Sequence, residues 1–241
     1  MRMRYPGCFV VALALCAALH GQNAVVTGHV DLVSSDGKPL RGALSNSAVW
    51  LTPLGTTAPA EPGADPKPAP RLVQKNKAFE PRVVILRAGA AVEFPNHDPF
   101  FHNVFSLFEG KRFDLGLYEA GGTRFVHFDR VGISYIFCNI HPDMSAVVVA
   151  VGTPYYALTD QAGNVSIAAV VPGRYLLHIW NERAQPGTAD SLTKELTIPA
   201  GPVSFGAIRI VVPAGPPIPH KNKYGRDYDP TTPSNPIYEQ P

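Results

Sequence analysis

The fold of this chain is decided by residues 135–144, YIFCNIHPDM, read together with residues 101–105, FHNVF. In the first stretch a run of aromatic and β-branched residues ends at Cys138, and a short polar segment follows. Such a run, bounded by turn-forming residues, predicts a strand that ends in a tight loop. We therefore expect Cys138 to close a strand, with His141 and Met144 in the loop after it. His102, in the second stretch, should arrive from a neighbouring strand.

These four residues form one set of metal donors, a thiolate from Cys138, imidazoles from His102 and His141, and a thioether from Met144. Thiolate and thioether are soft donors that favour copper, and the whole set is that of a blue-copper, or type 1, electron-transfer centre. Zinc is bound by cysteine, histidine and carboxylate side chains, and methionine is not among its usual ligands. The alternative is that Cys138 is a small buried apolar residue with the other donors near it by chance. We predict one type 1 copper ion bound by these four residues.

Residues 1–21 have the layout of a secretory signal peptide, with two arginines before the apolar run 8–19. That run is too short to span a bilayer. It also holds two of the three cysteines, which leaves Cys138 as the only thiol of the mature chain. In an oxidising compartment an unpaired thiol is a liability unless it is buried or bound. We predict a periplasmic or secreted protein with no transmembrane span in the mature chain.

The composition predicts an all-β protein with enough apolar residues to form a hydrophobic core. Hydrophobic residues make up 45% of the chain and charged residues 17%, while 25 prolines and 21 glycines exclude long helices over most of its length. The net charge of +2 comes from Arg2 and Arg4 of the signal, since the mature chain has 21 − 2 = 19 basic residues against 19 acidic ones. A neutral chain gives no reason to expect nucleic acid as a partner.

Two proline-rich stretches divide the mature chain. Residues 58–70 hold five prolines and should form an extended linker. Residues 213–241 hold eight prolines and predict an extended or disordered tail. The cluster from His220 to Tyr224 could dock on a partner, but we favour a solvated tail.

Between these stretches the sequence alternates short apolar runs with turn residues. Many short strands without a helical period indicate a sandwich or barrel with Greek-key connections. The expected strands cover residues 83–87, 91–94, 102–106, 124–128, 132–137 and 146–151.

The stretches VEFPN at 92–96, FHNV at 101–104 and YIFCNIHPDM at 135–144 resemble the cupredoxins of the plastocyanin and amicyanin group. The spacing Cys-x2-His-x2-Met is similar to the short ligand loop of amicyanin, and the wider run resembles bacterial cupredoxin-domain proteins often labelled methylamine utilisation proteins. The resemblance implies a Greek-key cupredoxin β-sandwich over residues 71–153. It also implies that Met144 is the weak axial ligand and that Asn103 braces the two ligand loops.

The flanks, residues 25–57 and 154–212, resemble the two halves of one carboxypeptidase regulatory-like, transthyretin-type β-sandwich. Neither half has enough strands to bury a core alone. We therefore expect the copper domain to be inserted into a sandwich completed across it, with residues 28–32 and 175–179 in one sheet. A separate hairpin and an independent small β domain are the alternative. Such sandwiches serve as scaffolds or carbohydrate-binding modules, so glycan contact through Trp50 and Trp180 is a further hypothesis, although buried core positions are favoured.

Two functions remain in contention. The first is an electron carrier that exchanges single electrons with redox protein partners. The second is a copper-delivery or glycan-binding module in which the copper is cargo or structural. Met144 is the only methionine of the mature chain, and copper chaperones are often methionine-rich, so the carrier is favoured. One cysteine and few imidazoles do not suggest a second metal centre, and we expect no enzymatic activity. Electrons should pass through the outer edge of His141, set among Pro142, Ile140 and Phe101.

Overall fold

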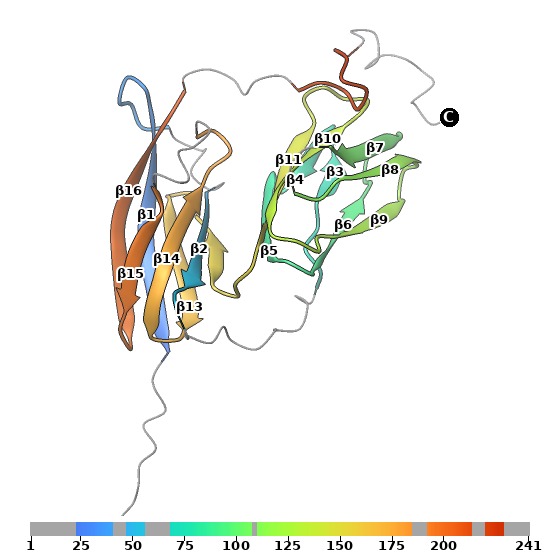
Figure 1. Ribbon diagram of the computed structural model, residues 1–241. Helices are drawn as coiled ribbons and strands as arrows, with labels where there is room; N and C mark the ends of the chain where they lie inside the picture. The colour runs from blue at the N-terminus through green and yellow to red at the C-terminus, as the bar shows by residue number, and fades with distance from the viewer. Residues whose placement is uncertain are drawn as a thin grey trace, which may run out of the picture.

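The computed structural model describes residues 23–40, 47–55, 68–107, 110–184, 192–213 and 220–228. Within these ranges every regular element is a β-strand, which confirms the all-β prediction (Figure 1). The expected signal peptide at 1–21 and most of the proline-rich linker lie outside the described residues.

The central part of the chain forms a sandwich of short strands. A five-stranded sheet of order β5-β11-β10-β7-β8 is mostly antiparallel, except that β11 pairs with β5 in parallel. A two-stranded antiparallel sheet of β6 and β9 and the small hairpin β3-β4 complete the unit. Its strands are β3 (Val73–Lys75), β4 (Ala78–Glu80), β5 (Val83–Arg87), β6 (Ala91–Pro95), β7 (His102–Ser106), β8 (Phe113–Tyr118), β9 (Thr123–His127), β10 (Gly132–Cys138) and β11 (Ser145–Val151).

The six strands expected from the sequence correspond to β5, β6, β7, β9, β10 and β11. Strands β3, β4 and β8 were not predicted. On β6, Val92 and Phe94 are fully buried while Ala91 and Glu93 are half-buried, which is the alternation of a strand with one buried face. These residues join Cys138, Ile140 and Met144 in one hydrophobic cluster, so the candidate metal loop is anchored in the core.

Strands that come before and after this unit in the sequence form a second sandwich. The sheet β13-β1-β16 faces the sheet β12-β2-β14-β15, and β1 and β2 precede the central unit while the others follow it. Val30 and Leu32 of β1 share one hydrophobic cluster with Leu177 and Ile179 of β14. The strands are β1 (Ala24–Ser34), β2 (Ala48–Pro53), β12 (Tyr156–Leu158), β13 (Asn164–Val170), β14 (Gly173–Trp180), β15 (Lys194–Ile198) and β16 (Pro202–Val212).

The expectation that residues 28–32 and 175–179 share one sheet is wrong. Strand β1 pairs with β13 and with β16, whereas both edges of β14 are taken by β2 and β15. The two segments therefore face each other across the core instead of pairing side by side. Apolar alternation marks which residues point inward but does not say which of two facing sheets a strand joins.

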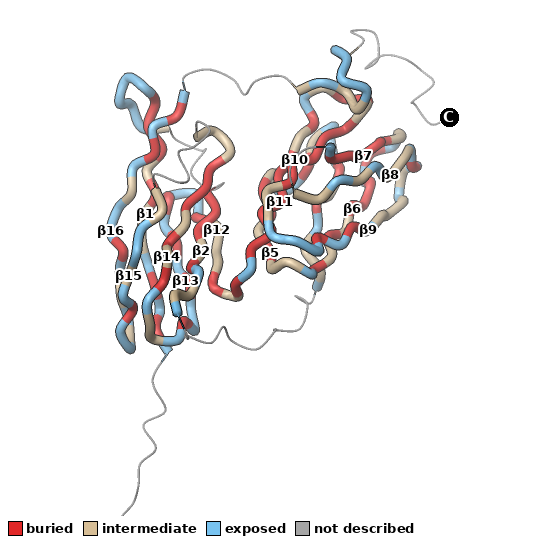
Figure 2. Tube along the Cα trace, in the orientation of Figure 1, coloured by how far each residue is buried: buried red, intermediate tan, exposed pale blue. Residues whose placement is uncertain are grey.

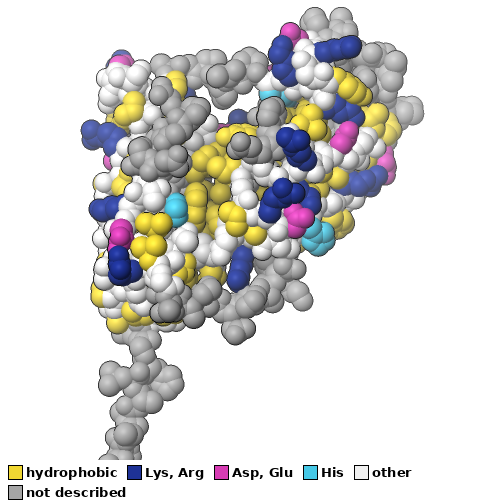
Figure 3. All heavy atoms as spheres, in the orientation of Figure 1, with side chains coloured by type: hydrophobic (Ala, Val, Ile, Leu, Met, Phe, Trp, Pro, Cys, Tyr) yellow, Lys and Arg dark blue, Asp and Glu magenta, His cyan; other side chains and the backbone are white. Residues whose placement is uncertain are grey.

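The two sandwiches meet through an apolar interface. Strand β11 is buried along nearly its whole length, because Ala146 and Val148 face the core of the central unit and Val147 and Val149 face the other sandwich (Figure 2). Hydrophobic side chains also gather between the two units on the face shown in Figure 3. A strand covered on both faces reads as a continuous apolar run, as this one does.

Trp180 lies in this interface and is only 7% exposed, so it is not available as a glycan platform. Trp50 is half-buried there, and its ring stacks on His178 with centroids 5.0 Å apart. At the rim, Arg82 Nε donates to both carboxylate oxygens of Glu182, at 2.7 and 2.9 Å. Both tryptophans therefore contribute to packing between the sandwiches.

Candidate metal centre

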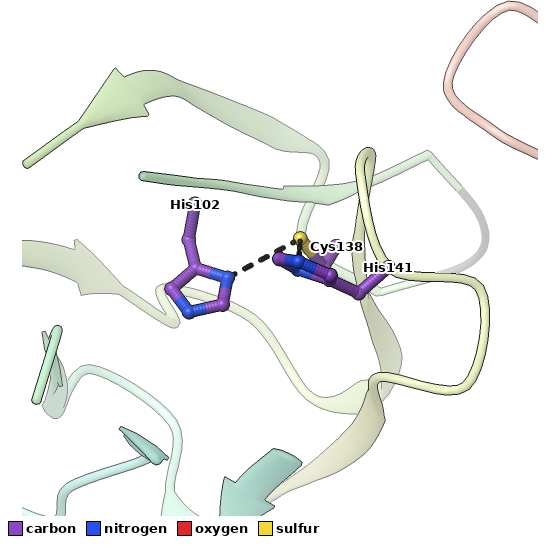
Figure 4. Close-up of side chains that lie close together, drawn as sticks. All are labelled: His102, Cys138 and His141. Carbon is purple, nitrogen blue, oxygen red and sulfur yellow. Dashed lines mark hydrogen bonds between the residues drawn. The ribbon is translucent and has the colours of Figure 1, made fainter. Parts of the chain in front are cut away.

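Adjacent strands deliver the predicted donors to one end of the central sandwich. Antiparallel pairing of β10 with β7 places Cys138 opposite Val104, two residues from His102 at the start of β7. The loop after β10 is tight, because Cys138 N–H donates to the Met144 carbonyl and Met144 N–H donates to the His141 carbonyl, both at 3.1 Å. His102, Cys138 and His141 consequently point toward one another (Figure 4).

The three side chains have the spacing of a shared metal site. Nδ1 of His102 and Nδ1 of His141 each lie 3.6 Å from Cys138 Sγ, and the donor atoms all fall within 4.8 Å of one another. A metal bound at about 2.3 Å to sulfur and about 2.0 Å to nitrogen, at tetrahedral to trigonal angles, separates the two donors by about 3.5 to 3.8 Å. The residues therefore fit a metal ion with one thiolate and two imidazole ligands.

Burial makes the Cys138 thiol a poor acid. It is fully buried, and this raises its pKa, while the backbone N–H groups of Asn103, Ile140 and His141 hydrogen-bond the sulfur and act in the opposite direction. Three donors aimed at one sulfur suit a thiolate better than a thiol. A cation between the two imidazoles would replace the proton and stabilise the charge.

The ring of His102 is oriented by a buried carboxylate that the sequence analysis did not identify. Asp98 Oδ2 lies 2.9 Å from His102 Nε2, and Asp98 is only 4% exposed. The same carboxylate accepts the backbone N–H groups of Asn76 and Lys77, at 2.6 and 3.0 Å. With Nε2 donating to Asp98, Nδ1 keeps its lone pair for a metal. The only signal in the sequence is a carboxylate four residues before the histidine.

Both imidazoles are suited to binding a metal in the neutral form. Burial lowers the pKa of His141 to about 4, with a further contribution from the nearby His102 and Lys77. Burial also lowers the pKa of His102, although the hydrogen bond to Asp98 opposes that shift. Neither ring needs to lose a proton when a metal binds at neutral pH.

Met144 and Asn103 are both buried near the three donors. Met144 is fully buried in the cluster that contains Cys138. Asn103 joins the two ligand segments through its backbone, because its carbonyl accepts the Asn139 N–H at 2.9 Å. Its side chain points elsewhere, and Nδ2 donates to Asp114 Oδ1 at 2.6 Å.

The surface above His141 differs from the expected apolar rim. His141 is 6% exposed, and Ile140, expected at the surface, is 2% exposed and belongs to the core. Phe100 covers both imidazoles instead, with ring centroids 5.4 Å from His141 and 5.3 Å from His102. Only a narrow edge of His141 therefore reaches solvent, and Ile140 is not part of the surface around it.

The prediction of a solvated tail is wrong for residues 220–228. This segment lies on the ligand loop, where the Tyr228 hydroxyl donates to the Cys138 carbonyl at 2.6 Å. The His220 ring stacks on Phe137, with centroids 4.1 Å apart. Residues 220–228 contain no proline and form a turn, and proline content does not reveal side chains that match a neighbouring surface.

Known proteins were compared with the chain by sequence and by structure. No protein-family model matches the sequence, and no curated protein does either. Solved cupredoxin structures do match. A purple cupredoxin from Nitrosopumilus maritimus is 21% identical, and the match covers 34% of this chain and 96% of that protein with a TM-score of 0.31.

Two further structures match the chain at similar levels. The reduced state of an amicyanin mutant is 18% identical, with 42% of this chain and 99% of that protein covered and a TM-score of 0.33. A copper-containing nitrite reductase from Thermus scotoductus SA-01 is 22% identical, with 51% of this chain and 28% of that protein covered and a TM-score of 0.34.

Within the described ranges, no helix has the length and hydropathy that a membrane span requires.

Proposed function

We propose that this chain binds one copper ion as a type 1 centre and carries single electrons between redox protein partners. The ligands would be His102, Cys138, His141 and Met144. The observation that carries the proposal is the equal distance of 3.6 Å from each imidazole Nδ1 to the buried Cys138 sulfur. The donor set consists of one cysteine sulfur, two histidine nitrogens and a methionine sulfur. Such a set is typical of copper sites and not of zinc sites.

Rigidity of the site favours a carrier over a copper-delivery protein. A carrier must hold both oxidation states in nearly the same geometry, so its ligands are fixed before the metal arrives. Here His102 is held by Asp98, and Cys138 is held by backbone N–H groups and by the closed loop to Met144. A delivery protein needs ligands that open for exchange, whereas these three donors are between 0% and 6% exposed.

We further propose that the protein is exported, has no enzymatic activity and uses the second sandwich as a scaffold of the carboxypeptidase regulatory-like type. The donors lie beneath Phe100 within the core, a setting suited to transfer of electrons and not to entry of a substrate. The scaffold role is supported by the apolar interface through which β11 packs on the sheet containing β2 and β14.

The optical spectrum of the Cu(II)-loaded protein tests the proposal. Thiolate-to-copper charge transfer should give an intense visible band, and Cys138→Ser should abolish it while the far-UV circular dichroism stays that of a β-protein. Zn(II) loading of the unchanged protein is the control for metal binding without colour. A colourless Cu(II) complex, or a Ser variant that keeps the band, would show that Cys138 is not the ligand of a type 1 site.

A further inference from the structure

Residues 220–228, here called the strap, hold two consecutive residues of the ligand loop from outside (Figure 1). The Tyr228 hydroxyl donates to the Cys138 carbonyl at 2.6 Å, and the Lys223 backbone N–H donates to Asn139 Oδ1 at 3.0 Å. The first contact is to the backbone carbonyl of Cys138 and the second is to the side chain of Asn139, the next residue toward His141. The strap therefore acts on the part of the loop whose conformation sets the geometry of the site.

Aromatic packing fixes the position of Tyr228. The His220 ring stacks on Phe137, the residue before Cys138, and the Tyr228 ring meets His220 edge-on at 5.3 Å. The Tyr228 hydroxyl also lies 3.2 Å from His220 Nδ1, so it can accept from that nitrogen while donating to the Cys138 carbonyl. Such paired roles define one orientation of the hydroxyl.

A shared carboxylate connects the strap to the segment that carries His102. Lys223 Nζ lies 2.8 Å from Asp114 Oδ2, and the Asn103 side chain donates to the other oxygen of the same carboxylate. The backbone of Asn103 in turn contacts the Cys138 sulfur and the Asn139 N–H. Both ligand segments are thus tied to the strap through directed contacts.

The strap has a turn of its own that presents these groups together. Asn222 Oδ1 accepts the backbone N–H groups of Tyr224 and Arg226, at 3.0 and 3.1 Å, and Gly225 adopts a φ of +74°. An ion pair between Lys221 and Asp227, at 2.7 Å, spans the same turn. A segment shaped in this way loses less conformational entropy on docking than an unstructured tail would.

We propose that the strap is a positioning element of the metal centre. By holding Cys138 and Asn139 it keeps the N–H groups of Ile140 and His141 directed at the sulfur, and it shields the thiolate side from water. Hydrogen bonding and hydrophobicity around the cysteine sulfur tune the potential of blue-copper sites. This inference rests on the proposed copper function for its effect on the metal, but the docking itself does not require a metal.

Two truncations of the full chain separate the strap from the residues beyond it. One ends at Pro219 and lacks the strap, and the matched control ends at Tyr228 and keeps it. In the metal-free proteins, backbone hydrogen exchange at Ile140 and His141 should be about tenfold faster without the strap, because local opening of the loop becomes easier, and unchanged in the control. Equal exchange in all three proteins would show that the strap does not hold the loop.

Point variants give a test that does not depend on the truncated chain folding. Tyr228→Phe removes the hydrogen bond to Cys138 and keeps the ring, and Tyr224→Phe is the matched control because Tyr224 is 71% exposed. In the copper-loaded proteins, only Tyr228→Phe should move the visible band and the reduction potential. A Tyr228→Phe protein with the band and potential of the unchanged chain would refute the positioning role, even if exchange at the loop becomes faster.

These readouts distinguish failure of the inference from failure of the proposed function. If the full chain gives no visible band with Cu(II), the type 1 proposal fails, and hydrogen exchange in the metal-free proteins still decides whether the strap holds the loop. If the full chain is blue and both sets of variants match it, the copper proposal stands and the strap proposal fails.

Discussion

Asp98 and His102 form a buried hydrogen-bonded pair, with the carboxylate oxygen 2.9 Å from Nε2 of the ring. The pair fixes which nitrogen of His102 carries the proton, and it directs Nδ1 toward Cys138 Sγ. A carboxylate on the outer nitrogen also makes the inner nitrogen a stronger donor. Asp98 is therefore expected to contribute to metal affinity without touching the metal.

Replacing Asp98 by Ala should weaken copper binding by about 10- to 100-fold, the usual cost of removing such a partner of a ligating histidine. Competition with a chelator of known affinity measures the loss. Asp143→Ala is the matched control, since Asp143 is an exposed carboxylate in the ligand loop. Equal losses in the two variants would mean that the general charge near the site, and not the contact with His102, is responsible.

Removal of the metal should make the stability of the protein depend on pH. The pKa of His141 is lowered to about 4 in the folded metal-free protein, and that of His102 is lowered as well. In the unfolded chain the His141 ring titrates near its ordinary value, so between pH 6.5 and about 4 it binds a proton in the unfolded state and not in the folded state. Stability should fall as the pH falls through this range, by about 1.4 kcal/mol per pH unit for His141, and His102 should act in the same direction.

Urea unfolding of the metal-free protein from pH 7.5 to 4.5 measures this dependence. His141→Gln should have a shallower slope because one of the two rings is gone. If the slope of that variant equals the slope of the unchanged chain, other groups dominate the acid sensitivity.

Met144→Leu should keep the visible band and raise the reduction potential, because loss of the axial thioether removes a donor that stabilises Cu(II). Met144 is fully buried, and leucine has a similar volume, so the cost in stability should stay below about 1.5 kcal/mol. Voltammetry and thermal unfolding measure the two effects. A variant with an unchanged potential would indicate that Met144 is packing and not a ligand.

Deletion of residues 26–54 should cause aggregation. It removes β1, which lies between β13 and β16, and β2, which lies between β12 and β14, so each sheet of the second sandwich loses an interior strand. Apolar residues such as Tyr175 and Leu177 would then be uncovered. Size-exclusion chromatography checks the outcome, with a shortened proline-rich linker at 58–67 as the control. A soluble monomer after the deletion would support the alternative of two independent units.

The donors of the site could be predicted from the sequence because their chemistry is local. Cys138 and His141 stand three residues apart at the end of an apolar run, and strand pairing brings His102 beside them. Asp98 could not be identified in the same way, since a carboxylate in an Asn-His-Asp-Pro turn is equally explained as a turn residue. Its role depends on burial, which only the fold determines.

Features that depend on tertiary contacts were missed or misplaced. Strand β8 contains Gly116 and lacks a clean alternation, and it exists because it pairs with β7. The strap was missed because its main partners are a backbone carbonyl, at Cys138, and the side chain of Asn139, which no residue pattern reveals. Ile140 was placed at the surface because a loop residue is exposed on average, whereas this loop turns it into the core.

Electrons should still leave through the narrow exposed edge of His141, and Pro142 is the half-buried neighbour at which this can be tested. A negative charge there would have to be desolvated in a transient complex, since such contacts are small and their centres contain few charges. Pro142→Glu should therefore slow electron exchange with an uncharged or anionic mediator, measured by stopped flow, while the visible band stays in place. Pro142→Ala separates the added charge from the loss of the proline ring, and Val131→Glu adds the same charge at an exposed position beside the opposite end of β10. If Pro142→Glu and Val131→Glu have the same rate, the route does not pass His141, and the hydrogen bond that the Tyr228 hydroxyl donates to the Cys138 carbonyl becomes the next path to test.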